Sequence, residues 1–477
     1  MGSKLSNVAL PVCLSFPPNL SNAQPIPPPL LAAGVLFAVH SQHGRILTCI
    51  ALYYQYTRDD ALIIKHLAKI DGLASLLRRR RELSMAQWPQ NDSRHGMPTG
   101  IDETDMWWAA TASNGTAVAF VSIAAEMWRG FVECSQVLDE IAGSRTTPAA
   151  VAQRLRNTSA QMASVAPPLL ATIRRSMAMD VTHSANATAG QPRCFPYVAG
   201  IPECGELPPP PQGPPTSRAS EAWRTYSEMF FSGALEPATI EEILAWHQTQ
   251  QGSGVRGSRL KVGVLSGSGN AVANGDNLET FTIHGFGYGL LSADLVEPFL
   301  LQYYALSAHA YTRGTWIAPE SAPVDRSSEA PSFCAPAGLV APLNLKYMLL
   351  YEEPVAHTLW VGKALPRVWL AEGQRVAVTS ATTAYGRLSF VYTSHLTSRR
   401  TVIISVTWPS GSGRVPSGGL RVRVRVPTLG VGRPRAIKAV EVAGRPWRAV
   451  NVAQETVDFT AEELKAGLLR TSISVLY

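Results

Sequence analysis

A helical pattern joins an aromatic, charged loop in residues 281–320, FTIHGFGYGLLSADLVEPFLLQYYALSAHAYTRGTWIAPE. From Leu290 to His309 the apolar residues recur at helical spacing, which predicts a helix with one buried face. Pro298 lies inside this helix, and we expect it to kink the helix. Three glycines precede the helix and are expected to give the backbone unusual torsions there, namely Gly285, Gly287 and Gly289.

The loop that follows is dense in aromatic and charged side chains, namely His309, Tyr311, Arg313, Trp316 and Glu320. Loops carried on rigid scaffolds are where binding chemistry concentrates, and tryptophan and tyrosine rings can stack on sugar rings. The composition therefore favours a carbohydrate cleft, with Tyr288 on its lining. The alternative remains open that Tyr311 and Trp316 wall the helical core while Arg313 and Glu320 form a structural ion pair.

Further helices are predicted on both sides of this stretch by apolar residues at helical spacing. They are expected at Leu30–Tyr56, Asp59–Leu83, Thr116–Ile141, Thr147–Met179, Glu221–Phe231, Glu236–Gln250 and Ala337–Tyr351. Asp59 or Asp60 suits the N-cap of the second helix, and Arg78–Arg81 would complement the dipole at its C-terminus. Pro167 and Pro168 are expected to break or bend the fourth helix.

Two segments lack helical patterns. Residues 1–29 are rich in Pro, Ser and Asn, and we expect them to be irregular. Ser184–Arg218 is a Pro-rich insertion whose run Pro208–Pro211 favours an extended conformation. Because its prolines deny helix hydrogen bonds, this insertion is expected to lie outside the helical core.

After about residue 357 the hydrophobic period changes from near four to two, which predicts strands. The expected fold class is α+β and multidomain, with a helical domain at residues 30–356 and an antiparallel β-sandwich at residues 357–477. Arg421, Arg423 and Arg425 alternate with valines and share one strand face. A solvated sheet face is the expected role of these arginines, with a stripe for an anionic ligand as the alternative.

Composition limits the classes of function. The chain has 477 residues, of which 46% are hydrophobic and 16% charged, so it can bury a large core in two or more units. The net charge of +7 is spread along the chain, whereas a nucleic-acid-binding protein should carry a clustered basic patch. We therefore expect no nucleic-acid partner, and the charge serves solubility or an acidic glycan.

Motifs for cofactors, metals and targeting are weak or absent. His40 and His43 have metal-ligand spacing but no third ligand, and no cofactor or metal is expected. No signal peptide or transmembrane stretch is visible, although Gly2 with Ser6 fits a myristoylation pattern, so the compartment and oligomeric state are left open. The six cysteines form no disulfide framework, and only Cys194 and Cys204 resemble partners.

A cluster of carboxylates forms a second candidate site. Asp102, Glu103 and Asp105 are flanked by Arg94, His95, Trp107 and Trp108. Neighbouring acids and indole rings shift the protonation of a carboxyl group, as an acid catalyst near neutral pH requires. The alternative is a helix N-terminus, where acids are favourable against the dipole without any catalytic role.

Four segments together resemble the six-hairpin glycosidase superfamily: YYQYTRDDALIIKHLAKIDGLASLLRRRR, NDSRHGMPTGIDETDMW, AYTRGTWIAPE and TLWVGKALPRVWLAEGQRVAV. The resemblance covers roughly residues 51–140 and 281–477. It implies an (α/α)6 toroid followed by a β-sandwich, with a carbohydrate cleft at one end of the toroid. Hydrolysis would use an acid among Asp102, Glu103 and Asp105 and a base at Glu320.

The sequence departs from this pattern because it predicts fewer helices than six complete hairpins require. Two other functions therefore stay open. One is a polysaccharide lyase, in which Tyr311 or His309 abstracts a proton and Arg313 neutralises a uronate. The other is a non-catalytic protein that binds glycans through Trp107, Trp108 or Trp316.

Overall fold

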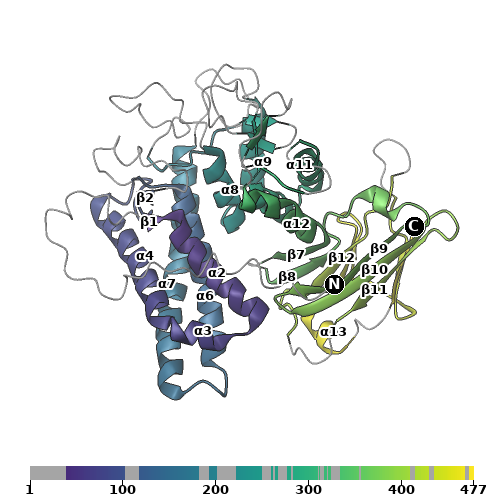
Figure 1. Ribbon diagram of the computed structural model, residues 1–477, viewed down its shortest axis with the longest axis horizontal. Coiled ribbons are helices and arrows are strands. Elements are labelled where there is room, and N and C mark those ends of the chain that lie inside the picture. Colours follow the sequence, from purple (N-terminus) through teal and green to yellow (C-terminus); the bar gives the residue numbers. More distant parts are fainter. Residues whose placement is uncertain are drawn as a thin grey trace. The chain divides into compact units, whose positions relative to one another are not determined.

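The computed structural model describes residues 39–101, 118–181, 193–200, 222–249, 259–261, 264–266, 277–280, 283–309, 311, 316–319, 321–323, 334–353, 356–408, 414–428, 435–467 and 472–477. Within these residues the chain has an α+β arrangement. Long helices dominate up to residue 349, and two sheets, mostly antiparallel, follow (Figure 1). The α+β class predicted from the change of hydrophobic period is confirmed.

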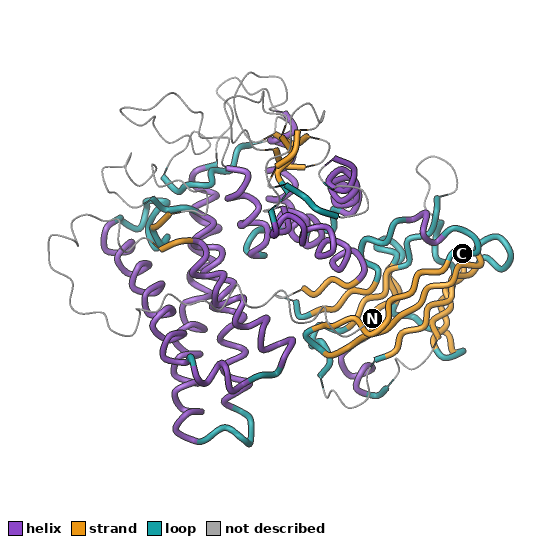
Figure 2. The backbone as a smooth tube through the Cα atoms, viewed as in Figure 1, coloured by secondary structure: helices purple, strands orange, loops and turns teal. Residues whose placement is uncertain are grey.

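The chain divides into two compact units. The helical unit comprises residues 1–289 and 305–338, and the sheet unit comprises residues 290–304 and 339–477. The chain therefore passes between the units three times, and the sheet unit contains helical residues as well as strands (Figure 2). The domain boundaries expected from sequence, at residues 30 and 357, stay a prediction.

The predicted helices form, with shifted ends. Those of the helical unit are α2 (Ser41–Thr57), α3 (Asp60–Lys65), α4 (Leu67–Gln87), α6 (Val121–Ala142), α7 (Ala149–Asp180), α8 (Ala222–Ser232) and α9 (Pro237–Thr249). Helix α6 contacts α2, α7 and α8, and most of its side chains are buried. It is the central helix of the described part of this unit. Closure of the helices into a toroid stays a prediction.

Helices α2 and α6 approach each other at glycines. A Cβ atom on Gly130 of α6 would lie 2.3 Å from the carbonyl oxygen of Gly44 in α2. A Cβ atom on Gly44 would lie 2.4 Å from the backbone of Glu126. Because no side chain separates the two backbones here, the residues beside these glycines are brought into direct contact.

Two helix predictions need correction. The helix expected at Asp59–Leu83 is interrupted at His66, which ends α3 and precedes α4. Asp59 caps α3, with its carboxylate accepting from the backbone N–H of Leu62 at 3.1 Å. The break expected at Pro167 and Pro168 does not occur, because α7 continues through both to Asp180, and the bend expected as the alternative stays a prediction.

The helix expected from Leu290 to His309 is two helices, α10 (Ile283–Ser292) and α11 (Val296–His309). Asp294 lies between them with a positive φ of 60°. Pro298 falls in the first turn of α11, where its missing N–H has no intrahelical partner to lose. The direction of the chain therefore changes at residues 293–295, and Pro298 interrupts neither helix.

The three glycines expected to adopt unusual torsions are ordinary helical residues of α10. Two of them, Gly285 and Gly289, serve close packing instead. A Cβ atom on Gly285 would lie 2.3 Å from the carbonyl oxygen of Ser227 in α8, and one on Gly289 would lie 2.4 Å from Cβ of Phe230. Small residues on this face let α10 lie against α8.

Part of the Pro-rich insertion belongs to the core of the helical unit, so its expected place outside the core is wrong for residues 193–200. Phe195, Tyr197 and Val198 are buried, and the backbone of Tyr197 accepts from Val121 at 2.9 Å. Cys194 is disulfide-bonded, with a partner beyond the described residues. The apolar side chains of this short segment supply the buried area that the flanking prolines do not.

The sheet unit contains two sheets. Their orders are β14-β13-β17-β11-β10-β9 and β15-β16-β12-β8-β7. The strands are β7 (Leu350–Glu353), β8 (Thr358–Val361), β9 (Arg375–Thr383), β10 (Gly386–His395), β11 (Thr401–Thr407), β12 (Leu420–Arg423), β13 (Ala439–Val442), β14 (Arg445–Pro446), β15 (Val450–Asn451), β16 (Thr456–Phe459) and β17 (Ser472–Leu476). Within these sheets β12 and β8 pair in parallel, and the other pairs are antiparallel.

The two sheets share one hydrophobic core. Residues of β10 alternate between buried and half-buried, as a strand with one face in a core should. Phe390 and Ile404 from the larger sheet and Val361, Val422 and Phe459 from the smaller one belong to the same buried cluster. This arrangement agrees with the predicted sandwich.

Smaller elements complete the described chain: β1 (Val39–His40), β2 (Gly100–Ile101), β3 (Arg259–Lys261), β4 (Val264–Ser266), β5 (Asn277–Glu279), β6 (Ser321–Pro323), α12 (Ala335–Leu349), η5 (Arg367–Leu370) and α13 (Ala461–Lys465). None of the described helices is long and apolar enough to cross a bilayer.

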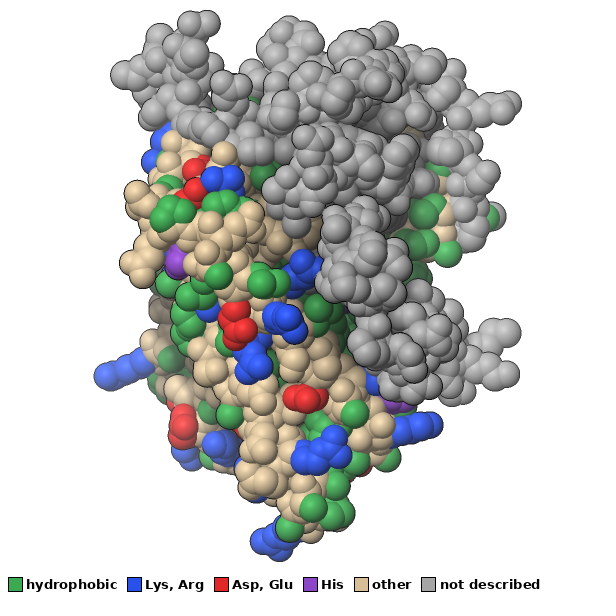
Figure 3. Space-filling model, turned by 90° about the vertical axis from the view of Figure 1, so that its left-hand side faces the viewer, with side chains coloured by type: hydrophobic (Ala, Val, Ile, Leu, Met, Phe, Trp, Pro, Cys, Tyr) green, Lys and Arg blue, Asp and Glu red, His purple; other side chains and the backbone are tan. Residues whose placement is uncertain are grey.

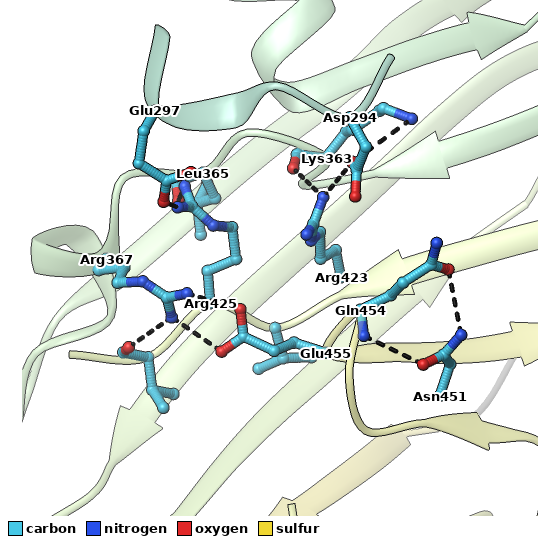
Figure 4. A network of polar contacts seen from close by, with 12 residues as sticks. Asp294, Glu297, Lys363, Leu365, Arg367, Arg423, Arg425, Asn451, Gln454 and Glu455 are labelled. Carbon is cyan, nitrogen blue, oxygen red and sulfur yellow. Dashed lines mark hydrogen bonds and ion pairs between the residues drawn. The ribbon is translucent and has the colours of Figure 1, made fainter. Parts of the chain in front are cut away.

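The solvated face expected for three arginines is wrong for Arg423 and Arg425, whereas Arg421 is half-buried. Arg423 and Arg425 are 7% and 2% exposed. Arg423 Nη1 lies 2.5 Å from Asp294 Oδ1, and Arg425 Nη2 lies 2.5 Å from Glu297 Oε1 (Figure 4). The carboxylates come from the α10–α11 turn and the start of α11, more than a hundred residues earlier, so strand alternation alone could not predict them.

Lys363 lies in the same network and is 1% exposed. Its Nζ lies 3.6 Å from the ring centre of Trp360 and 3.8 Å from Asp294 Oδ1. Burial lowers the pKa of Lys363 to about 8, although the charges of Glu353 and Asp294 oppose that shift. The amine is therefore a poorly solvated cation at neutral pH.

Candidate functional site

The residues expected to form the site fall into two groups. Those outside the described residues are Asp102, Glu103, Asp105, Trp107, Trp108, Arg313 and Glu320. The described ones are Arg94, His95, Tyr288, His309, Tyr311 and Trp316. The assignment of all of these residues to a site stays a prediction, and the contacts of the second group show what each is able to do.

Arg94 and His95 are held in a tight turn after α4. The Asp92 carboxylate accepts from Arg94 Nε at 2.9 Å and from Nη2 at 2.6 Å. His95 Nδ1 lies 2.7 Å from the carbonyl oxygen of Trp88, whose ring lies under the Arg94 guanidinium at 5.1 Å. These contacts fix the turn that leads to β2 and then to the acidic residues from Asp102 onward.

Tyr311 and Trp316 lie together in the loop after α11. Tyr311 is buried, and its hydroxyl donates to the carbonyl oxygen of Ala337. Trp316 is 57% exposed, with its ring centre 5.9 Å from that of Tyr311. Its φ of 54° is rarely adopted by a bulky residue. A large exposed ring in a costly backbone conformation, packed on a fixed tyrosine, is typical of a binding surface.

His309 is the last residue of α11, and its ring is half-buried. Its Nδ1 is shielded from solvent and has no hydrogen-bond partner among the described residues. A nitrogen of this kind is able to bind a ligand or an ordered water.

Tyr288 is buried in the helical unit. Its ring centre lies 5.2 Å from that of Phe231, and the Arg129 guanidinium lies 5.0 Å from its ring. Through its contact with Arg129, Tyr288 borders a group of buried charged residues that was not expected from sequence. We call this group the charge cluster, and its members are Arg45, Glu126, Arg129, Glu133 and Glu228.

In the charge cluster one guanidinium bridges two helices. Arg45 Nη2 of α2 lies 3.0 Å from Glu126 Oε1 of α6 and 3.0 Å from Glu228 Oε1 of α8. Both carboxylates are buried. The close approach of α2 and α6 at Gly44 brings the neighbouring Arg45 into reach of Glu126.

Arg129 is the second cation of the charge cluster. Its Nε donates to Glu133 Oε1 at 2.7 Å, its Nη1 donates to the carbonyl oxygen of Phe231, and its guanidinium lies 4.1 Å from the Phe231 ring. Burial alone would lower the pKa of Arg129, but the negative charges of Glu133 and Glu126 raise it overall. Arg129 is therefore a permanent cation in the interior.

Buried carboxylates that bind arginines in this way suit a structural or electrostatic role. A signal for the cluster was present in the sequence. Glu126, Arg129 and Glu133 are spaced three and four residues apart, which places them on one face of a helix whose neighbouring residues are mostly apolar. Their partners on α2 and α8 carry no such signal.

Metal ligation finds no support among the described residues, which contain no group of three or more His, Cys, Asp or Glu side chains arranged to hold an ion.

Comparison with known proteins gives few matches. No protein-family model and no curated protein matches the chain. Similar solved structures include a protein titled "Glycoside hydrolase", with 12% identity, a TM-score of 0.33 and coverage of 91% of this chain and 72% of that one. They also include a GH127 beta-arabinofuranosidase, with 12% identity, a TM-score of 0.32 and coverage of 93% and 73%. Likenesses at this level carry no argument about function.

Proposed function

We propose that this protein is glycoside hydrolase-like and hydrolyses a poly- or oligosaccharide with two carboxylates. Glu103 or Asp102 acts as the general acid, with Asp105 beside it, and Glu320 acts as the base that activates water. These roles follow from the resemblance of the sequence segments to six-hairpin glycosidases.

The observation that carries the proposal is the Trp316 platform. Trp316 presents an exposed ring four residues before Glu320, and the buried Tyr311 supports that ring. Stacking on a rigid aromatic face orients a sugar at low entropic cost, because the ring loses little freedom on binding. The residue that would bind the sugar is therefore only four positions from the proposed base in the sequence.

The backbone on both sides of Glu320 is anchored. The carbonyl oxygen of Pro319 accepts from the buried Thr280 hydroxyl, and that of Ala318 accepts from Cys334 N at 3.0 Å. On the other side, β6 pairs with β5. A catalytic group must be held close to its productive geometry, and these contacts supply such support.

The structure bears on the two alternatives differently. For a lyase, Tyr311 is a poor base because it is buried and its hydroxyl donates to the Ala337 carbonyl oxygen. His309 is then the only candidate base of the two named. A non-catalytic glycan-binding protein would use the same Trp316 platform, so turnover alone separates it from a hydrolase.

The test begins with a glycan-array screen, followed by an assay for released reducing ends on every glycan that binds. On the substrate found, Glu103→Gln and Glu320→Gln should each lower kcat by about 100-fold or more without changing the melting temperature. Trp316→Ala should raise KM by about tenfold. Glu82→Gln changes an exposed glutamate, and Ile317→Ala changes an exposed apolar residue next to Trp316 that has no ring for stacking, so both should have little effect on either constant.

Three outcomes would contradict the proposal. Binding without reducing ends from any glycan would identify a glycan-binding protein. Unsaturated-sugar absorbance on a uronic-acid polymer would identify a lyase. Normal turnover in both Glu→Gln variants would show that the two-carboxylate assignment is wrong.

A further inference from the structure

Two arginines of the helical unit lie on contacting helices, and the charge of one acts on the other. Arg81 belongs to α4 and Arg175 to α7, and these two helices are in contact. Both side chains are half-buried, and the Nε atom of each is shielded from solvent. Lys and Arg side chains are prominent on the face of the molecule shown in Figure 3, with fewer acidic side chains between them.

Neither arginine has a carboxylate partner among the described residues, and neither Nε atom has a hydrogen-bond partner there. Acidic residues on the same or adjoining segments form ion pairs with other arginines. Glu82 lies 3.5 Å from Arg78 Nε, and Asp92 binds Arg94. The third neighbouring acid, Glu236, binds Arg174.

The two cations lie close enough to repel each other. Burial lowers the pKa of Arg81, and the positive charge of Arg175 lowers it further. Of the acids, only Glu82 opposes this shift, from the exposed side of α4. Two half-buried like charges are costly to hold together unless an anion joins them.

Arg175 is fixed in place for such a role. Its Nη2 donates to the carbonyl oxygen of His95 at 2.6 Å, in the turn that Arg94 and Asp92 stabilise. A guanidinium carries five N–H donors, and within the described residues Arg175 uses one of them while Arg81 uses none. Planar guanidinium groups match the oxygens of phosphate and sulfate and form charge-assisted hydrogen bonds with them.

We propose that Arg81 and Arg175 together bind a phosphate or sulfate group. The group is either a free ion or an ester on a larger ligand such as a saccharide. The proposal uses none of the residues proposed for hydrolysis, so it does not depend on the proposed function.

The test is titration calorimetry of the full chain with inorganic sulfate and inorganic phosphate, in buffer whose ionic strength is kept constant with chloride. Wild-type protein should bind at one site. Arg81→Gln and Arg175→Gln should each weaken binding by about tenfold or more. Arg79→Gln removes an exposed arginine from the same helix and should leave the affinity unchanged.

Thermal unfolding adds a readout that a purely structural arginine would not give. Arg81 makes no hydrogen bond within the described residues, and it is repelled by Arg175. Arg81→Gln should therefore keep or raise the melting temperature in chloride, yet lose the stabilisation that sulfate gives the wild type. This variant also avoids the risk that Arg175→Gln loosens the turn at His95.

The source of the group is tested with glucose 6-phosphate and glucose 6-sulfate. Tighter binding of an ester than of the free ion, by tenfold or more, would support a site for a substituted saccharide, and equal affinities would support a site for the free ion. The proposal is overturned if neither ion binds the wild type, or if Arg81→Gln binds as the wild type does.

Discussion

At the scale of single residues, the buried amine of Lys363 should make the stability of the folded protein depend on pH. The lysine is held against Trp360 and Tyr351, with Glu353 and Asp294 as its acidic neighbours and Arg421 and Arg423 as its basic ones. Because its pKa is lowered to about 8 in the folded state, the folded protein binds fewer protons than the unfolded chain between about pH 8 and 10.5. The contribution of Lys363 to the free energy of unfolding should therefore rise with pH between about pH 8 and 10.5.

The prediction is tested with Lys363→Met, which keeps the side-chain volume and removes the titration. Relative to this variant, the wild type should gain up to about 3 kcal/mol of unfolding free energy between pH 7.5 and pH 10. Urea unfolding followed by circular dichroism measures the gain. Lys438→Met, at an exposed site, should behave as the wild type does, and parallel pH profiles for wild type and Lys363→Met would refute the prediction.

At the scale of elements, the packing of α2 on α6 depends on two small residues. Gly130→Ala would place a Cβ atom 2.3 Å from a backbone oxygen that no side-chain rotation can move. We expect it to lower the unfolding free energy by about 1–3 kcal/mol, as overpacking does. Gly72→Ala on α4 is the matched control, because its Cβ would meet nothing within 4 Å.

Gly72→Ala should stabilise the protein by about 0.5–1 kcal/mol through helix propensity. Chemical denaturation of the two variants side by side gives both values. Equal effects of the two substitutions would show that α2 and α6 do not pack through Gly44 and Gly130.

Periodicity in the sequence located the long helices and the strands but not the breaks between elements. The interruption at His66 and the turn at Asp294 occur without Gly or Pro, the residues that usually mark such breaks. Conversely, Pro167 and Pro168 lie inside α7, because tertiary packing outweighs their local cost. The prolines on both sides of segment 193–200 likewise favoured a surface position, but tertiary packing buries its apolar side chains.

The candidate site stays a prediction, but the surroundings of its described residues can be compared with the sequence. The exposure of Trp316 and its contact with Tyr311 agree with an aromatic binding loop, which its composition indicated. The charge cluster was missed because Arg45 and Glu228 reach Glu126 from helices distant in sequence. Such pairs depend on how helices approach one another, which no local pattern encodes.

At the scale of the whole molecule, the sheet unit is not contiguous in sequence. Asp294 and Glu297 neutralise Arg423 and Arg425, so a fragment containing only the strands would leave two buried cations unpaired. Breaking buried ion pairs by removal of one partner is strongly destabilising, because the remaining charge is uncompensated.

In the full chain, Asp294→Asn with Glu297→Gln should lower the unfolding free energy by about 1.5–3 kcal/mol, because the arginines are buried but the Glu297 side chain is 75% exposed. Amide hydrogen exchange in β12 should accelerate in this variant, since β12 carries Arg423. Glu441→Gln, on the exposed side of β13, should leave both measurements unchanged. Unaltered exchange in β12 would mean that the two carboxylates do not support the sheet.

The position of β17 has a consequence for protein synthesis. Although β17 is the last strand of the sequence, it lies inside the larger sheet between β13 and β11. While the ribosome is still translating, those two strands have open edges, and open edges recruit other chains. Deletion of β17 would make that state permanent, so we expect the resulting protein to aggregate even though every residue of the helical unit is present.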